Sequence, residues 1–415
     1  IRLDYQQEQG FVSALPLGLN QVAVQRGLTT SGTAIFMPFR SCEVFQPGGL
    51  YYGLNAQTKH IILADRKTLK CPNGIVLGTP GSGKSFFAKR EMTNAFFATR
   101  DHILILDPEN EYTALTEQLH GQTIYLAPDS HSYLNPMDLD LSTDVGESPM
   151  LMQADFLLSQ CELMMASYGN PLMPIEKSLI DRCISLVYRD YLKNPKPENM
   201  PILGDLYQCL REQHNSRADD LATAMEIYVT GSLSYLNHRT NVDLNNRMVC
   251  YNTSKLGQGL KKLVMSNVQK HIWQRTAVNR YAGITTRIFL DEFHLLLKEP
   301  QTAAYTAEIY KRFRKWNGIP TSLTQNVKDL LDSSEIENIL ENSDFVLMLN
   351  QGASDRNILA QRLGISPQEL NHVTNSGEGE GLLFFGDKII PFEDKFPRDT
   401  QLYRVMTTKP SDLAA

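Results

Sequence analysis

The sequence lacks the features that mark secreted, membrane-spanning and disulfide-stabilised proteins. Its six cysteines are spread over 415 residues with no close pair, whereas disulfide frameworks and zinc sites usually cluster their cysteines. No uncharged apolar run reaches the roughly 18 residues needed to cross a bilayer, and the polar start, Ile1-Arg2-Leu3-Asp4, is not a signal peptide. We therefore expect reduced thiols in a cytosolic protein. Because residue 1 is not methionine, we also expect a fragment or a processed product.

An excess of positive charge is missing as well. The 40 Lys and Arg residues are outnumbered by 46 Asp and Glu, which gives a net charge of −6. The chain as a whole therefore does not attract nucleic acid, and such a contact would need a local basic patch. Hydrophobic residues make up 42% and charged residues 21%, the balance of a folded globular protein. The length fits one large α/β domain with additions, or two domains.

Short apolar runs alternate with helical stretches along much of the chain, which indicates an α/β fold with a buried parallel sheet. Residues 1–70 read as a strand-rich lead-in. Helical spacing dominates 145–230, so we expect a helical insertion there, between core segments 71–144 and 231–415. The predicted strands are 74–77, 103–106, 123–126, 248–251, 287–290, 320–323 and 345–349, followed by a hairpin at 381–390.

The strongest local signal is a glycine-rich loop between an apolar run and a helix-like stretch at 84–100. It matches G-x-x-x-x-G-K-[ST], in which glycines let main-chain N–H groups curl around a phosphate at a helix N-terminus. We expect ATP here, with Lys84 at the β- and γ-phosphates and Ser85 on magnesium. The strand before the loop and the helix after it disfavour a chance glycine cluster. The loop residues are Gly78, Thr79, Pro80, Gly81, Ser82, Gly83, Lys84 and Ser85.

Two acidic residues follow the apolar run 287–290. We expect Asp291 to hold magnesium in its outer shell and Glu292 to polarise the attacking water, which is the role that distinguishes an ATPase from a nucleotide binder. The alternative is that Asp291 caps the next helix and Glu292 is a solvated residue of its first turn.

Two further strand ends carry polar residues. The segment Asp107-Pro108-Glu109-Asn110-Glu111-Tyr112 either faces the ligand at the carboxyl end of a parallel strand or starts a helix at Pro108, and chemistry alone does not separate these readings. Thr324-Gln325-Asn326 ends another strand, where an amide can sense the γ-phosphate through water.

The densest basic run is 311–315, and its apolar neighbours recur on one helical face, which predicts an amphipathic helix. Glu308 is spaced to pair with Arg312. The run is either a solvated basic face, an arginine finger that acts on a neighbouring subunit's ATP, or a DNA contact.

Two other features are dismissed as ligand sites. The run 377–381 resembles a dinucleotide loop, but it precedes a strand and its two carboxylates would repel phosphate. His294 lacks a second ligand at metal spacing, so we expect it to make local hydrogen bonds.

The order of these motifs resembles the type IV secretion and conjugation ATPases of the VirB-four kind, within the RecA-like pumping ATPases. The Asp-Pro-Glu-x-Glu-Tyr and Leu-Asn-Pro pair is the most specific part of the match. The matching pieces are Gly53-Leu54-Asn55 with Thr58, 78–85 with Phe86 and Lys89, 107–112, Leu134-Asn135-Pro136, Leu290-Asp291-Glu292, Arg314-Lys315 with Gly318, and 324–326.

The resemblance implies a RecA-like P-loop core with an all-helical insertion, and a chain that is the C-terminal ATPase domain of a longer protein. It implies that Arg314 and Lys315 complete a catalytic site, that Gln325 is the sensor, and that Phe86 joins the nucleotide-binding residues. It also implies work on the cytoplasmic side of the cell membrane, with other channel components, a coupling ATPase and a homo-hexamer as partners.

Three functions follow from these expectations. The leading one is an ATPase that powers a type IV secretion or conjugation machine. The second is a DNA translocase related to HerA, FtsK or the coupling proteins, which the acidic balance disfavours. The third is a scaffold whose assembly is gated by nucleotide binding.

Overall fold

The computed structural model describes residues 4–23, 27–34, 42–141, 148–166, 172–297, 300–325, 339–409 and 412. The chain divides into two units, Ile1–Cys42 and Glu43–Ala415. No helix within these described ranges is both long and apolar enough to cross a membrane.

Within its described residues, 4–23, 27–34 and Cys42, the first unit contains two helices, α1 (Gln7–Ala14) and α2 (Thr30–Ala34). The elements described before residue 50 are thus helices rather than the strands expected there, whereas two strands lie in the rest of the predicted strand-rich lead-in 1–70, whose bounds stay a prediction. The physical reason is local, because the α1 segment QEQGFVSA has no apolar alternation and carries helix-compatible Gln, Glu and Ala.

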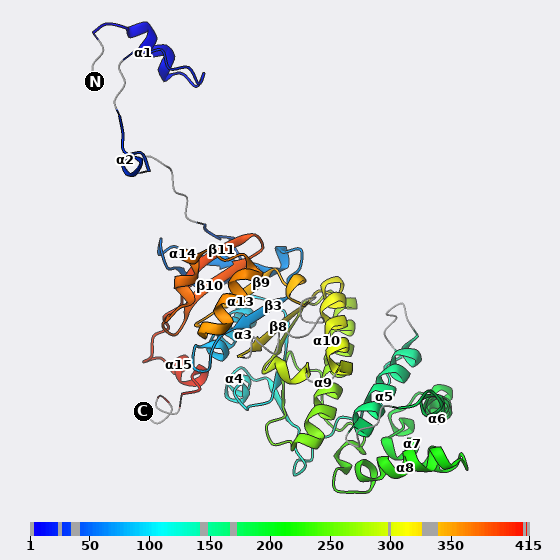
Figure 1. Cartoon of the computed structure of the whole chain (residues 1–415). Coiled ribbons are helices and arrows are strands. Elements are labelled where there is room, and N and C mark those ends of the chain that lie inside the picture. The colour runs from blue at the N-terminus through cyan, green and yellow to red at the C-terminus, as the bar shows by residue number, and fades with distance from the viewer. Residues whose placement is uncertain are drawn as a thin grey trace. The chain divides into compact units, whose positions relative to one another are not determined.

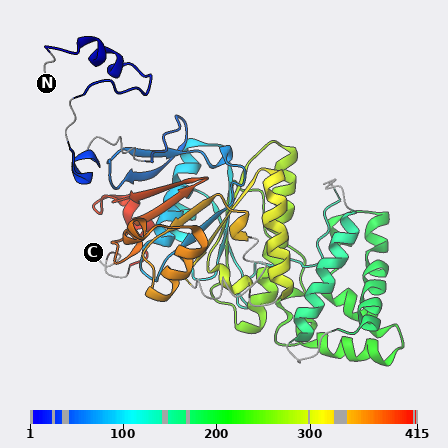
Figure 2. The same ribbon diagram turned by 45° about the horizontal axis from the view of Figure 1, so that its top comes forward.

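The second unit is built on one large sheet with helices around it (Figures 1 and 2). Its strands are β1 (Leu50–Asn55), β2 (Ile61–Ala64), β3 (Gly74–Leu77), β4 (His102–Asp107), β5 (Gln122–Tyr125), β6 (Met248–Asn252), β7 (Thr286–Leu290), β8 (Gly318–Thr324), β9 (Phe345–Met348), β10 (Glu380–Phe385) and β11 (Lys388–Glu393). Its helices are α3 (Lys84–Ala98), α4 (Thr113–Gln118), α5 (Pro149–Ala166), α6 (Pro174–Lys193), α7 (Leu203–Arg211), α8 (Ser216–Val229), α9 (Gln258–Tyr281), α10 (Pro300–Phe313), α13 (Ala353–Leu363), α14 (Pro367–Leu370) and α15 (Gln401–Met406). The short 3-10 helices that matter below are η1 (Arg66–Thr68), η4 (Phe293–Leu296) and η5 (Arg314–Trp316).

The eleven strands have the order β2-β1-β11-β10-β9-β3-β8-β7-β4-β6-β5. From β9 to β5 every neighbouring pair is parallel, and the four strands at the other side join antiparallel. Strands β3, β6, β7, β8 and β9 are buried at every residue, as the continuous apolar runs predicted. The predicted α/β class with a parallel-rich sheet is confirmed.

Helices α5 to α8 follow β5 in the chain and gather beyond α9 and α10, as both views show (Figures 1 and 2). Helix α5 packs on α9, which in turn contacts β4 and β7. Helix α6 carries the apolar spacing seen in the sequence, with Leu179, Ile180, Cys183 and Ile184 buried on one face. The division of the chain at 145 and 230 stays a prediction.

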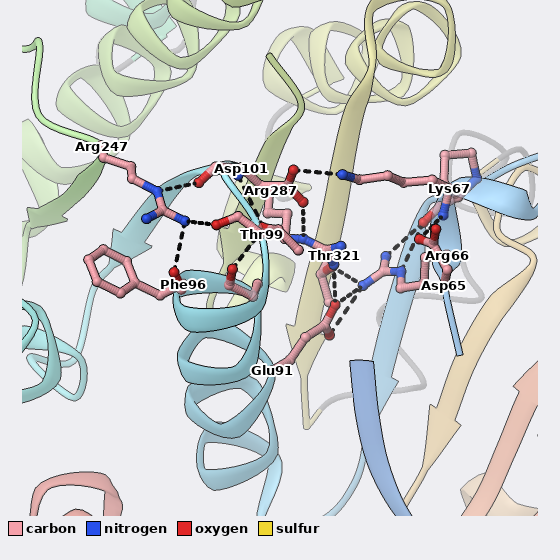
Figure 3. Close-up of polar contacts among 12 residues, drawn as sticks. Asp65, Arg66, Lys67, Glu91, Phe96, Thr99, Asp101, Arg247, Arg287 and Thr321 are labelled. Atoms are coloured by element: carbon pink, nitrogen blue, oxygen red, sulfur yellow. Dashed lines mark hydrogen bonds and ion pairs between the residues drawn. The ribbon is translucent and has the colours of Figure 1, made fainter. Parts of the chain in front are cut away.

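A buried ion network ties α3 to the sheet (Figure 3). The Glu91 carboxylate accepts hydrogen bonds from Arg66 Nη1 and Arg287 Nη1, each at 2.9 Å, and from the Tyr52 hydroxyl at 3.0 Å. Arg287 Nε also donates to Asp101 at 2.9 Å. Both guanidinium groups and Glu91 are at most 1% exposed, so each charge depends on its partners for the interactions that water no longer provides.

We expect Glu91→Gln to lower the free energy of unfolding by about 3–5 kcal/mol, because it removes the negative charge that the buried guanidinium groups of Arg66 and Arg287 share. Urea denaturation followed by the fluorescence of Trp273 and Trp316 measures the change. The control is Asp190→Asn, whose carboxylate is 81% exposed and pairs with Lys193 at the surface, with an expected cost below about 1 kcal/mol. Equal effects of the two substitutions would contradict the importance of the network.

Candidate active site

The predicted site residues come from strands that end side by side. Strands β3, β8 and β7 are consecutive and parallel in the sheet, with ends at Leu77, Thr324 and Leu290. The glycine-rich loop follows β3, Gln325 follows β8, and Asp291 follows β7. The fold therefore brings the three sequence-distant motifs to one carboxyl edge, where parallel sheets bind ligands.

The glycine-rich loop has the backbone geometry of a phosphate cradle. Gly81 and Gly83 have φ angles of 76° and 102°, in the left-handed region that favours glycine. A Cβ on Gly78 would lie 2.4 Å from Ser82 Oγ, so a side chain there would fill the cradle. Ser82 Oγ itself is buried without a hydrogen-bond partner among the described residues, which suits a donor kept for a ligand.

Lys84 opens α3 and folds back over this loop. Its ammonium group donates to the main-chain oxygens of Gly78 at 2.9 Å and Thr79 at 3.2 Å. Burial lowers the pKa of Lys84, and the carboxylates of Glu292 and Asp291 oppose that effect. The partners of the Lys84 side chain at the loop are main-chain carbonyls, which an anionic phosphate would outcompete.

Asp291 is 4% exposed and accepts a hydrogen bond from the main-chain N–H of Glu292 at 2.9 Å. Burial raises its pKa to about 8, and the charge of Glu111 adds to the shift. Glu111 Oε2 is itself buried with no hydrogen-bond partner in the described part of the chain. Carboxylates gathered in this way favour a cation between them, so the arrangement fits magnesium, with Ser85 and Asp291 as the residues that would hold it.

Glu292 takes a left-handed backbone conformation, with φ 44° and ψ 46°, which is unusual for a residue other than glycine and is often found at functional sites. Its Oε1 accepts a hydrogen bond from Gln325 Nε2 at 2.9 Å, and its Oε2 lies 3.1 Å from His294 Nδ1.

Burial by itself would raise the pKa of Glu292. His294, Lys84 and Gln325 outweigh that effect and hold the pKa below its usual value. Glu292 therefore stays ionised at neutral pH and keeps its capacity to accept a proton. Glu292 is not a solvated helix residue. His294 Nδ1 lies at ion-pair distance from it, but within the described residues that nitrogen does not make the hydrogen bond expected of His294.

The segment 107–112 combines features of both earlier readings. The Asp107 side chain stabilises the turn rather than facing a ligand. Its two carboxylate oxygens accept hydrogen bonds from the main-chain N–H groups of Glu111 at 3.0 Å and Tyr112 at 2.9 Å. The helix begins at Thr113 rather than at Pro108. The turn holds Glu111 so that it lines the same cleft as Lys84 and Asp291.

The cleft at this edge has a volume of about 1020 Å³. Sequence reasoning missed two of its walls, which are residues 377–380 of the glycine-glutamate loop and the segment 394–409. The main-chain nitrogen of Gly379 lies 3.5 Å from the position of a Cβ on Gly83, so the dismissed loop lies directly over the phosphate loop. The charge of Glu380, which argued against a ligand there, is balanced by Lys395 at 3.2 Å.

Arg314 and Lys315 lie elsewhere. They form part of η5, which comes just before Gly318, the first residue of β8. The phosphate loop instead follows Leu77, which pairs with Thr324, the last residue of β8. The two ends of a seven-residue strand are roughly 20 Å apart, and both side chains are exposed. The expected amphipathic helix is confirmed as α10, with Phe313 buried and Arg312 bonded to Glu308 at 2.6 Å. Asn326 lies outside the described residues.

Comparisons with known proteins agree with this geometry. A family model of the TraG P-loop domain matches residues 61–376. No curated protein matched the sequence. Among solved structures, the chain is similar to VirB4 of Thermoanaerobacter pseudethanolicus, with a TM-score of 0.77, 23% identity, and coverage of 87% of this chain and 100% of that one.

A second similarity is to the plasmid coupling protein TrwB. Its complex with the non-hydrolysable ATP analogue ADPNP aligns with a TM-score of 0.56 and 13% identity over 88% of this chain and 96% of that one. The complex of TrwB with ADP and Mg²⁺ aligns with a TM-score of 0.52 and 12% identity over the same shares of the two chains. These likenesses show a shared fold, and the resemblance inferred from the motifs is confirmed. Since the family model covers most of the sequence, this chain belongs to the TraG P-loop domain family.

Proposed function

We propose that this protein is an ATPase that hydrolyses ATP to power a type IV secretion or conjugative transfer machine. The observation that carries the proposal is the Glu292 carboxylate, ionised and hydrogen-bonded to Gln325 Nε2 at 2.9 Å beside the glycine-rich loop. A protein that only bound nucleotide would not need a strained, ionised carboxylate at this place. Membership of the TraG P-loop domain family supports the secretion or conjugation setting.

The positions of the residues support a role for each of them. Loop residues 78–83 and Phe86 bind the nucleotide, and Lys84 neutralises the β- and γ-phosphates. As the oxygen of the attacking water bonds to the γ-phosphorus, the bond from that phosphorus to the β–γ bridging oxygen breaks, and ADP leaves with the bridging oxygen. Glu292 accepts the proton that the water loses, and Gln325 senses the γ-phosphate through the same water. Magnesium, held by Ser85 and Asp291, would neutralise charge on the phosphate oxygens when bound.

The family supports a proposed setting for the motor. We propose a core formed by 71–144 and 231–415 with the helical insertion 145–230, acting as a homo-oligomer, such as a hexamer, on the cytoplasmic side of the cell membrane. Other channel components and a coupling ATPase are the proposed partners. The exposed side chains of Lys311, Arg314 and Lys315 also favour a DNA translocase as a second candidate. DNA-stimulated turnover that falls steeply with salt would support that candidate.

We expect Glu292→Gln to bind ATP normally and to lower the turnover number by about 100-fold or more, because it removes the general base without changing the shape of the site. A phosphate-release assay and an ATP-binding titration separate the two effects. Glu198→Gln, on an exposed 3-10 helix of the insertion, is the matched control. If cells carrying Glu292→Gln still support transfer, the scaffold reading replaces the motor.

We expect Lys84→Ala to weaken ATP binding by roughly 10- to 100-fold, because it removes charge-assisted hydrogen bonds to two phosphates. Equilibrium titration with ATP measures the loss. Lys196→Ala, an exposed substitution outside the cleft, should leave the affinity unchanged. An unchanged affinity in Lys84→Ala would show that the phosphates lie elsewhere.

We expect specific activity to rise with protein concentration, because Arg314 is too far from its own phosphate loop and acts on a neighbour. Arg314→Ala should lower turnover by about 10³-fold or more, as for other arginine fingers. Lys315→Ala should cost less, since an ammonium group lacks the planar fork of a guanidinium.

Mixing separates action on a neighbour from action within one chain. Arg314→Ala keeps an intact phosphate loop and Lys84→Ala keeps an intact Arg314, so mixtures of the two should recover part of the activity that each lacks. Activity that is independent of concentration and unaffected by Arg314→Ala would contradict catalysis between subunits.

A further inference from the structure

The cleft has polar and acidic residues on one side of the phosphate loop and residues that follow β11 on the other. Asp291, Glu292 and Gln325 follow β7 and β8, on one side of β3. Strand β11 lies on the other side of β3 and runs parallel to it, because β9, β10 and β11 are successively antiparallel and β9 is parallel to β3. Residues that follow β11 therefore reach the same edge of the sheet from the side opposite Glu292.

Those residues bring an aromatic wall into the cleft. The ring of Phe396 lies 5.8 Å from that of Phe86, and the ring of Tyr403 lies 5.5 Å from Phe86 and 6.5 Å from Phe396, measured between centroids. All three residues line the cleft that contains Lys84 and Ser85. Phe86 and Phe396 are only half buried, so aromatic surface stays open to a ligand.

Neighbouring charged side chains fix the positions of the rings in the aromatic wall. The guanidinium of Arg90 lies 4.3 Å from the centroid of the Phe396 ring, and Arg90 Nε donates to Asp394 at 3.2 Å. The Tyr403 hydroxyl donates to Asp412 at 2.7 Å. Rings fixed in this way lose little entropy when a flat ligand stacks on them.

The direction of a bound triphosphate follows from the proposed function, on which this inference rests. With the γ-phosphate beside Glu292, Lys84 reaches the β- and γ-phosphates, and the main-chain N–H groups at the start of α3 hold the α-phosphate. Phe86 is the second residue after Lys84, so the nucleoside leaves the loop beside its ring. The far end of the nucleotide then faces the aromatic wall rather than the carboxylates.

We propose that Phe86, Phe396 and Tyr403 form the subsite that stacks the nucleobase of the bound nucleotide. Stacking accepts any flat base because every base has a π face, and the strength grows with the area covered. The subsite therefore takes purine nucleotides more tightly than pyrimidine nucleotides, and it discriminates weakly between the two purines.

The test compares Mg²⁺–ATP with Mg²⁺–tripolyphosphate, which has the phosphates and no base. We expect wild-type protein to bind ATP more tightly than tripolyphosphate. Phe396→Ala should weaken ATP binding roughly 10-fold and leave tripolyphosphate binding unchanged. Phe396→Tyr should keep wild-type affinity for both ligands, whereas Lys84→Ala should weaken both.

A fluorescent variant gives a second readout that does not depend on a loss of binding. Phe396→Trp places an indole in the wall, away from the buried Trp273 and Trp316. ATP should quench its fluorescence and tripolyphosphate should not. Equal affinity of the wild type for the two ligands, an equal loss of both in Phe396→Ala, or the absence of ATP-specific quenching would overturn the subsite. None of these results would affect the case for hydrolysis, which Lys84→Ala and Glu292→Gln test separately.

Discussion

The arrangement of the site depends on one buried carboxylate far from the chemistry. Glu91 accepts hydrogen bonds from Arg66 and Arg287, which come from η1 and β7, and it lies two turns along the helix that Lys84 opens. Helix α3 begins at the phosphate loop, and β7 ends at Asp291. The shared ion pair therefore fixes the loop relative to β7, and it resists rearrangement because separating buried charges is costly.

At the carboxyl edge of the sheet, where α3 begins and β7 ends, negative side chains gather in the cleft. Burial raises the pKa of Asp291 to about 8, and the charge of Glu111 adds to that shift. Burial lowers the pKa of Lys89 to about 8 against the effect of Glu111, Asp107 and Asp291, and Lys89 Nζ donates to the main-chain oxygen of Met406 at 3.0 Å. Within the described residues Asp291 and Glu111 form no ion pair with Lys84 or Lys89, and a metal bound with the nucleotide would add positive charge there.

The sequence predicted those parts of the site that lie within a few residues of a recognisable pattern. The loop, Asp291, Glu292 and Gln325 each follow a short apolar run, and parallel strands place such ends together. The loop 377–381 was dismissed because its role depends on β10 joining the sheet beside β9, which no local pattern encodes. The pairing of Glu91 with Arg287, 196 residues apart, is equally invisible in the sequence. The helices of the first 34 residues were missed because short, weakly patterned segments carry little signal.

The proposed reaction is the attack of water on the γ-phosphate of ATP at this site. The most direct measurement is hydrolysis of ATP by the wild-type protein in ¹⁸O-labelled water, with mass analysis of the phosphate released. We expect Mg²⁺-dependent release of phosphate that carries one solvent oxygen per turnover, and no release when EDTA removes the metal. Tight ATP binding with no labelled phosphate at any protein concentration would contradict it.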